Sequence, residues 1–129
     1  AIGEKGLTDW VFWQKKAPQY QMKGVYQQAD FFLLPTEYEI FGMVLLEAMF
    51  FRRVVLTTPN GGADMLLRSG ENGLVLEKSD PARWAKTLLD IAADPEKKAR
   101  MEQAAYETVI HENTWDALAD RFLAVYEKR

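Results

Sequence analysis

Two glutamates, Glu39 and Glu47, stand on either side of a single glycine, Gly42, in the stretch from residue 37 to residue 49. An apolar run at residues 31–34 precedes the stretch, and apolar residues then recur at helical spacing, which predicts a strand, a loop and a helix. A helix that opens at such a glycine points its free N–H groups and the positive end of its dipole at the loop. The residues therefore predict an anion site, for which phosphate is the obvious ligand.

The glutamate spacing alone leaves other interpretations open. The chain contains eleven Glu, so about one pair with this spacing is expected by chance. In the simplest alternative, Glu39 is a solvated loop residue and Glu47 a polar position on an otherwise buried helix. A glycoside hydrolase pair is disfavoured, because a fully helical 39–47 segment would rise about 12 Å, against roughly 5 to 9.5 Å between hydrolase carboxyl groups.

Strands and helices alternate around this site. Apolar and β-branched runs predict strands at residues 10–13, 31–34, 54–57 and 74–76, with short helices near residues 20–30, 43–51 and 64–68. Asp80 and Asp94, each followed by proline, mark two further helix starts, and Asn113 or Thr114 caps a last one. This alternation predicts an α/β fold with a parallel sheet, helices on both faces and a helical C-terminus.

That fold predicts where a ligand binds and which side chains are buried. Such sheets bind ligands beyond the carboxyl ends of their strands, so the loops at residues 14–18, 35–42 and 58–62 are expected to share one rim. Core positions are expected at Trp84 and Leu88, and along an apolar stripe on the last helix formed by Trp115, Leu118, Phe122, Val125 and Tyr126.

Composition sets aside several classes of protein. At 129 residues and 48% hydrophobic content, the chain is expected to form one soluble domain. It has no cysteine and one histidine, His111, so we expect no metal site and treat His111 as a solvated helix-end residue. The net charge of −3 predicts no nucleic-acid binding. Without a membrane-length apolar run or a signal-peptide pattern, we expect a cytoplasmic protein, with peripheral attachment to the inner face of the membrane left open.

The chain as a whole resembles a known family. Ala29-Asp30 before an apolar strand, the run EIFGMVLLEAM, Gly61-Gly62, Asn72-Gly73 and the final WDALADRFLAVYEK follow one another with family-like spacing. In this order they are similar to the C-terminal half of GT-B fold glycosyltransferases, the retaining group 1 (family 4) enzymes. The resemblance implies a Rossmann-like, partial C-terminal domain over residues 1–129. It also implies a nucleotide sugar as substrate, with no cofactor or metal required by this part.

By this resemblance the loop and the helix after it form the donor site. Glu39 would lie near the donor sugar and position it, and the backbone at Phe41 and Gly42 would reach the sugar hydroxyls. Met43 and Val44 would offer N–H groups to the diphosphate. Such prearranged donors at a helix start stabilise negative charge on a departing diphosphate.

The nucleoside half of the donor would lie further along. Glu47 would hold the ribose, because one carboxylate can accept hydrogen bonds from two neighbouring hydroxyls. Gln14, Lys15 and Lys16 could border the base. In the family, the nucleoside diphosphate leaves on the face that the acceptor enters, so no glutamate needs to act as a nucleophile.

The chain departs from the family at two places after the helix. Arg52 stands where the family has a glycine, and arginine costs about 1 kcal/mol relative to glycine if the backbone there is left-handed. Arg52 and Arg53 could reach a phosphate, but we expect them to be solvated. Met65, with Asp64 beside it, stands where the family tends to have a glutamate, which leaves the family's contact at that position open.

The family also has parts that these residues do not include, namely two earlier βα units and an N-terminal domain with the acceptor site. In the doubly wound order, the absent strands would lie between those expected at residues 10–13 and 31–34. We therefore expect an unpaired sheet edge, and either self-association through it or a rearranged first strand. The leading interpretation is part of a glycosyltransferase, inactive alone. The alternative is a non-catalytic interaction or regulatory module on the same scaffold.

Overall fold

Three short parallel strands form the sheet in the computed structural model, which describes residues 2–127 apart from the side chains at 122 and 125–127. The strands are β1 Phe31–Leu34, β2 Val54–Thr57 and β3 Leu74–Val75, in the order β1-β2-β3. Phe31 lies opposite Val54, and Leu56 lies opposite Leu74. Parallel strands need crossover connections, so the loops that leave their carboxyl ends gather at one edge of the sheet.

Helices connect the strands and continue the chain after them. Their bounds are η1 Gly3–Lys5, α1 Gln19–Gln28, α2 Met43–Phe50, α3 Gly61–Leu66, α4 Pro81–Ala92, α5 Pro95–Glu107, the π-helical turn η2 Thr108–Glu112 and α6 Trp115–Glu127. The Asp80 and Asp94 carboxylates accept from backbone N–H groups at the starts of α4 and α5, each at 2.9 Å. Thr114 Oγ1 accepts from the Ala117 N–H at 3.2 Å. These bonds confirm the predicted caps.

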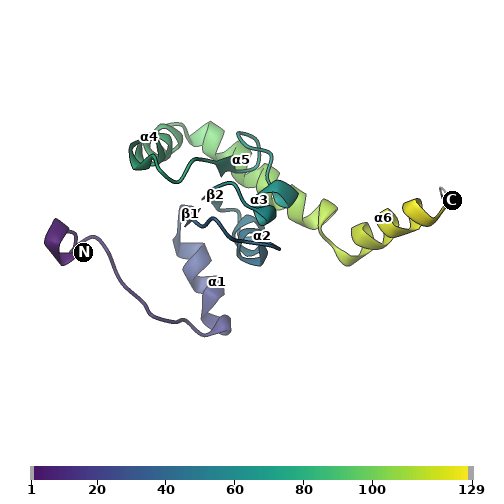
Figure 1. The fold of residues 1–129 in the computed structure, drawn as a ribbon, viewed down its shortest axis with the longest axis horizontal. Coiled ribbons are helices and arrows are strands. Elements are labelled where there is room, and N and C mark those ends of the chain that lie inside the picture. The colour runs from purple at the N-terminus through teal and green to yellow at the C-terminus, as the bar shows by residue number, and fades with distance from the viewer. Residues whose placement is uncertain (1, 128–129) are drawn as a thin grey trace.

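Two apolar clusters lie on opposite faces of β2, because neighbouring residues of a strand point to opposite sides. Val55 packs in one cluster with Tyr26 of α1 and with Leu45, Ala48 and Met49 of α2. On the other face are Val54, Leu56, Leu76, Trp84, Ile91 and Met101, with Leu88 packed against them. Figure 1 shows α1 below the sheet and α4 and α5 above it. The α/β architecture and the core positions Trp84 and Leu88 are therefore confirmed.

The strand predicted at residues 10–13 is wrong. The segment is not a strand, and the side chains of Trp10, Phe12 and Trp13 are 80% exposed or more. Figure 1 shows this part of the chain as an irregular trace that leads to the lower end of α1 rather than along the sheet. A strand forms only where a neighbour takes its backbone hydrogen bonds. Within residues 2–127, no strand pairs with this segment.

The last helix is also placed differently from the prediction. Trp115 is 87% exposed and Leu118 is 36% exposed, so the core stripe predicted on this helix is wrong for both residues, while Phe122, Val125 and Tyr126 lie outside the described side chains. Figure 1 shows α6 extending away from the sheet. An apolar stripe shows that a helix face needs a partner, but it does not place that partner. Of the helices that the structure describes, none is both long and apolar enough to span a membrane.

Candidate functional site

The loop at residues 35–42 turns into α2 at Gly42, where the backbone is left-handed, with φ 65° and ψ 30°. The first helical hydrogen bond runs from the Leu46 N–H to the Gly42 carbonyl at 2.9 Å. The N–H groups of Met43 and Val44 therefore have no carbonyl one turn earlier within the helix. Glu39 Oε1 accepts from the Gly42 N–H at 3.1 Å and so closes the loop on itself.

A second loop, at residues 58–62, comes directly against the first. The Gly62 N–H donates to the Glu39 carbonyl at 3.0 Å. A methyl group on Gly62 would lie 2.7 Å from Gly42 Cα and 3.1 Å from Glu39 Cγ, which leaves no room for a side chain. The structure thus brings together two of the three loops predicted to share a rim.

Buried hydroxyl and amide groups tie these two loops to the strand ends. Thr57 Oγ1 donates to the Leu34 carbonyl at 2.9 Å, and the Thr58 hydroxyl donates to the Thr36 carbonyl. Asn60 Nδ2 donates to Thr57 Oγ1 at 3.0 Å, and Asn60 Oδ1 accepts from the Ala63 N–H at 2.9 Å as the cap of α3. The sequence analysis missed this network. With Asn60 as its cap, α3 begins at Gly61 rather than at the predicted residue 64. An asparagine before two glycines was the sequence signal that could have indicated this helix start.

Glu47 lies on the second turn of α2, where its carboxylate meets α1. The hydroxyl of Tyr26 donates to Glu47 Oε2 at 2.9 Å, and Tyr26 is only 3% exposed. Burial, and then the hydrogen bond to Glu47 and its negative charge, raise the pKa of the Tyr26 hydroxyl well above its usual value. The hydroxyl therefore stays protonated and remains a donor. Spacing gave no sign of this contact, because the two residues are 21 positions apart.

The remaining positions of the predicted site lie at the start of α2 and differ in exposure. Phe41 is 68% exposed and Met43 is 60% exposed, while Val44 is half-buried and Gly42 is buried. The beginning of the helix is thus open to a ligand. Among the described residues, no group of histidine, cysteine, aspartate or glutamate side chains could hold a metal ion.

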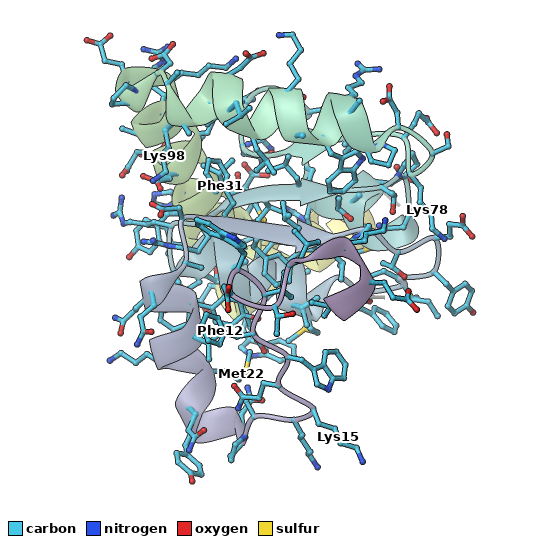
Figure 2. All side chains as sticks on the ribbon, turned by 90° about the vertical axis from the view of Figure 1, so that its left-hand side faces the viewer. Phe12, Lys15, Met22, Phe31, Lys78 and Lys98 are labelled. Carbon is cyan, nitrogen blue, oxygen red and sulfur yellow. The ribbon has the colours of Figure 1, made fainter. Side chains whose placement is uncertain are left out.

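The third predicted loop, which carries Gln14, Lys15 and Lys16, does not join the other two. These side chains are exposed, and Gln14 Nε2 donates only within the segment, to the Lys16 carbonyl at 3.4 Å. Lys78 lies beside the loop before α2, because its Nζ is 3.1 Å from Glu37 Oε1, and it therefore shows where that loop is in Figure 2. Figure 2 shows Lys15 at the far end of α1, well away from Lys78. The predicted common rim is therefore wrong for residues 14–18.

The two arginines after α2 lie at the opposite end of that helix from Gly42. Arg52 is left-handed, with φ 57°, so the condition under which arginine costs stability relative to the family's glycine is met. Its exposed guanidinium stacks 4.1 Å above the Tyr106 ring and bonds to Gln103. Arg53 is half-buried and donates to the carbonyls of Phe51 at 2.7 Å and Ala29 at 2.5 Å. The prediction of solvated arginines is confirmed for Arg52, which is exposed, and wrong for Arg53, whose half-buried guanidinium joins the end of α2 to the end of α1.

The other singled-out side chains are at the surface. Met65 is 70% exposed, and Asp64 beside it is exposed as well. His111 is exposed in the π-helical turn η2, which confirms its assignment as a solvated helix-end residue.

Fold and site together define a Rossmann-like α/β domain whose ligand edge presents an open helix start. The chain belongs to the family described as glycosyl transferases group 1, whose model matches residues 1–108. Among curated proteins, it is similar to D-inositol 3-phosphate glycosyltransferase of Thermomonospora curvata, with 33% identity over 125 residues. That match covers 95% of this chain and 28% of the relative, so the chain spans little more than a quarter of that protein's length.

Solved structures confirm the fold. Sucrose-phosphate synthase from Thermosynechococcus elongatus is 26% identical with a TM-score of 0.83, over 98% of this chain and 32% of that one. The C-terminal domain of a group 1 glycosyl transferase from Francisella tularensis is 23% identical with a TM-score of 0.78, over 88% and 59%. HepE from Anabaena, solved in complex with UDP-glucose, is 21% identical with a TM-score of 0.77, over 99% and 35%. The likeness to the C-terminal half of GT-B glycosyltransferases is thus confirmed.

Proposed function

We propose that this chain supplies the donor side of the active site of a retaining glycosyltransferase, which transfers a sugar from a nucleoside diphosphate to an acceptor. The observation that carries the proposal is the open start of α2 at Gly42, held in place by Glu39 and by the close approach of Gly62. UDP-glucose bound to HepE, a protein of the same fold, supports a nucleotide sugar as the ligand class.

The diphosphate lies at the N–H groups of Met43 and Val44. These donors are fixed by the helix before the reaction begins, so they stabilise the charge that develops on the leaving diphosphate without reorganising. The positive end of the helix dipole acts in the same direction. The half-buried Val44 and the buried Gly42 exclude water from part of this surface, which strengthens both effects.

Glu39 positions the donor sugar rather than attacking it. Its Oε1 is committed to the Gly42 N–H at 3.1 Å, which orients the carboxylate and leaves Oε2 to accept from a sugar hydroxyl. The backbone of Phe41, beside it in the same loop, completes the sugar contacts. Neither role requires a metal, and departure of the diphosphate on the acceptor's face accounts for retention.

Glu47 accepts hydrogen bonds from the ribose hydroxyls. The loop with Gln14, Lys15 and Lys16 contacts the base only if the rest of the protein brings this loop to the site. The acceptor side also comes from outside these residues, so the 129-residue chain alone is inactive in this proposal. The nucleotide sugar and the N-terminal part of the same protein are its partners.

The test uses the whole protein and measures sugar transfer with purified variants. Glu39→Ala and Glu47→Ala are each expected to lower transfer roughly 100-fold or more, as loss of a prearranged polar contact does elsewhere. The matched control is Glu37→Ala, because Glu37 lies in the same loop but pairs only with the exposed Lys78, so transfer should stay near wild type. Unchanged transfer in both Glu39→Ala and Glu47→Ala would refute the assignment. Nucleotide-sugar binding without any turnover by the wild type would instead favour a non-catalytic module.

A further inference from the structure

The contact between Tyr26 and Glu47 is the direct polar link between α1 and the proposed ribose-binding carboxylate. The phenol ring of Tyr26 is held by two other aromatic rings. It stacks on Phe51, with centroids 5.5 Å apart and planes at 13°, and it tilts against Phe32 at 5.8 Å. Since a tyrosine has only two side-chain torsions, these contacts fix where its hydroxyl can lie.

The fixed hydroxyl of Tyr26 contacts only one of the two carboxylate oxygens of Glu47. It donates to Oε2 at 2.9 Å, and burial moves the pKa of this phenol still further above neutral pH, so the proton remains on the tyrosine. A glutamate on a helix otherwise samples several rotamers, and choosing one of them costs entropy when a ligand binds. Among the described residues, Tyr26 is the one side chain that hydrogen-bonds to the Glu47 carboxylate. The bond is made to Oε2, so Oε1 is left for a ligand.

We propose that Tyr26 is a positioning residue for nucleotide recognition: its hydroxyl holds Glu47 in the rotamer that presents Oε1 to the ribose hydroxyls of a nucleoside diphosphate. The inference rests on the proposed ribose role of Glu47 and adds a residue to it. The competing explanation is that Tyr26 is a core residue whose hydroxyl merely requires a partner. That explanation predicts an effect on stability but none that depends on the ribose.

The experiment separates these explanations by removing the ribose hydroxyls from the ligand. The whole protein is titrated calorimetrically with UDP, GDP and ADP, and the tightest binder is then compared with its 2′,3′-dideoxy form. Tyr26→Phe keeps the ring in the core, and its fold is checked by thermal unfolding. Tyr20→Phe is the matched control, because Tyr20 lies on the same helix but is 81% exposed.

Tyr26→Phe is expected to raise the dissociation constant of the ribonucleotide about 3- to 10-fold, which matches the usual net contribution of one hydrogen bond. The dideoxy nucleotide should bind the variant and the wild type equally, and Tyr20→Phe should change neither. In a Glu47→Ala background, Tyr26→Phe should cause no further loss, because Tyr26 acts through Glu47.

Equal weakening of both nucleotides by Tyr26→Phe, or no weakening of either, would overturn the inference while leaving the proposed function intact. If Glu47→Ala retains the preference for the ribonucleotide, the ribose role of Glu47 is wrong and the inference falls with it. If the wild type binds no nucleoside diphosphate at all, the donor-site proposal itself fails, and that result is read from the first titration.

Discussion

At Gly62 the backbone comes so close to the loop before α2 that even a methyl group meets main-chain atoms. The added carbon would lie 2.7 Å from Gly42 Cα and 2.8 Å from Gly42 N, neither of which can move without shifting the start of the helix. Gly62→Ala is therefore expected to destabilise the protein by about 1 to 3 kcal/mol, the usual cost of overpacking. Because the shift also moves the N–H groups of α2, nucleotide binding should weaken in the same variant.

Gly24 provides the control for that prediction. It lies in α1, and an added methyl group would find no heavy atom within 4 Å. Gly24→Ala should stabilise the helix by about 0.5 to 1 kcal/mol, because alanine loses less backbone entropy on folding. Urea unfolding of the two variants measures both changes. Similar changes of either sign would show that the contact at Gly62 does not constrain the loop.

Arg52 carries the only positive φ of a non-glycine residue among those described, at 57°. Arg52→Gly and Arg52→Ala remove the same contacts to Tyr106 and Gln103, so the difference between the two variants isolates the backbone. Arg52→Gly should be the more stable by about 1 kcal/mol, because glycine has no Cβ atom to clash with the backbone in this left-handed region. Thermal unfolding of the pair measures the difference, and equal stabilities would contradict a left-handed turn at this position.

At the scale of elements, Asn60 is expected to matter more than an ordinary helix cap. It is 7% exposed, and it joins the end of β2 to the start of α3 through Thr57, Thr58 and Ala63. Asn60→Ala should lower the free energy of unfolding by about 2 kcal/mol. The substitution removes the cap of α3 and also leaves the buried partners of Asn60 without their hydrogen bonds. Asp80→Ala, at the exposed cap of α4, should cost about 1 kcal/mol. Denaturant midpoints compare the stabilities of the Asn60→Ala and Asp80→Ala variants. An equal loss of stability in both would mean that the buried network adds nothing beyond the helix cap.

Elements with a local cause were predictable from the sequence. The aspartate caps before proline, the strand at Val54–Thr57 and the glycine at the start of α2 each follow from the chemistry of a few adjacent residues, and all three are observed. These features need no information about distant parts of the chain.

Elements and contacts that depend on a distant partner were not predictable in the same way. Residues 10–13 have the composition of a strand but no neighbouring strand, and Trp115 lies on an apolar stripe without a covering surface. The bond from Tyr26 to Glu47 needs α1 and α2 to pack side by side, and neither helix encodes that alone. Apolar periodicity predicts that a surface needs covering, whereas tertiary packing decides what covers it.

For the whole molecule, the free edge of β1 is the exposed feature with the largest consequence. Within residues 2–127, β1 pairs with β2 on one side and with no strand on the other. Leu33 in this strand is 44% exposed, and Trp10, Phe12 and Trp13 in the segment before α1 are further exposed apolar side chains. An unpaired strand edge of apolar composition is a template for pairing with another chain.

We therefore expect the 129-residue chain on its own to self-associate in a concentration-dependent way, which light scattering after size-exclusion chromatography would measure. Leu33→Lys should shift the distribution toward monomer, because a charged side chain on an edge strand opposes pairing. Leu89→Lys is the matched control, since Leu89 is 70% exposed but lies on α4, so it should leave association unchanged. A monomer at every concentration would show that the edge is covered in solution. An equal effect of both substitutions would mean that association uses general apolar surface rather than the β1 edge.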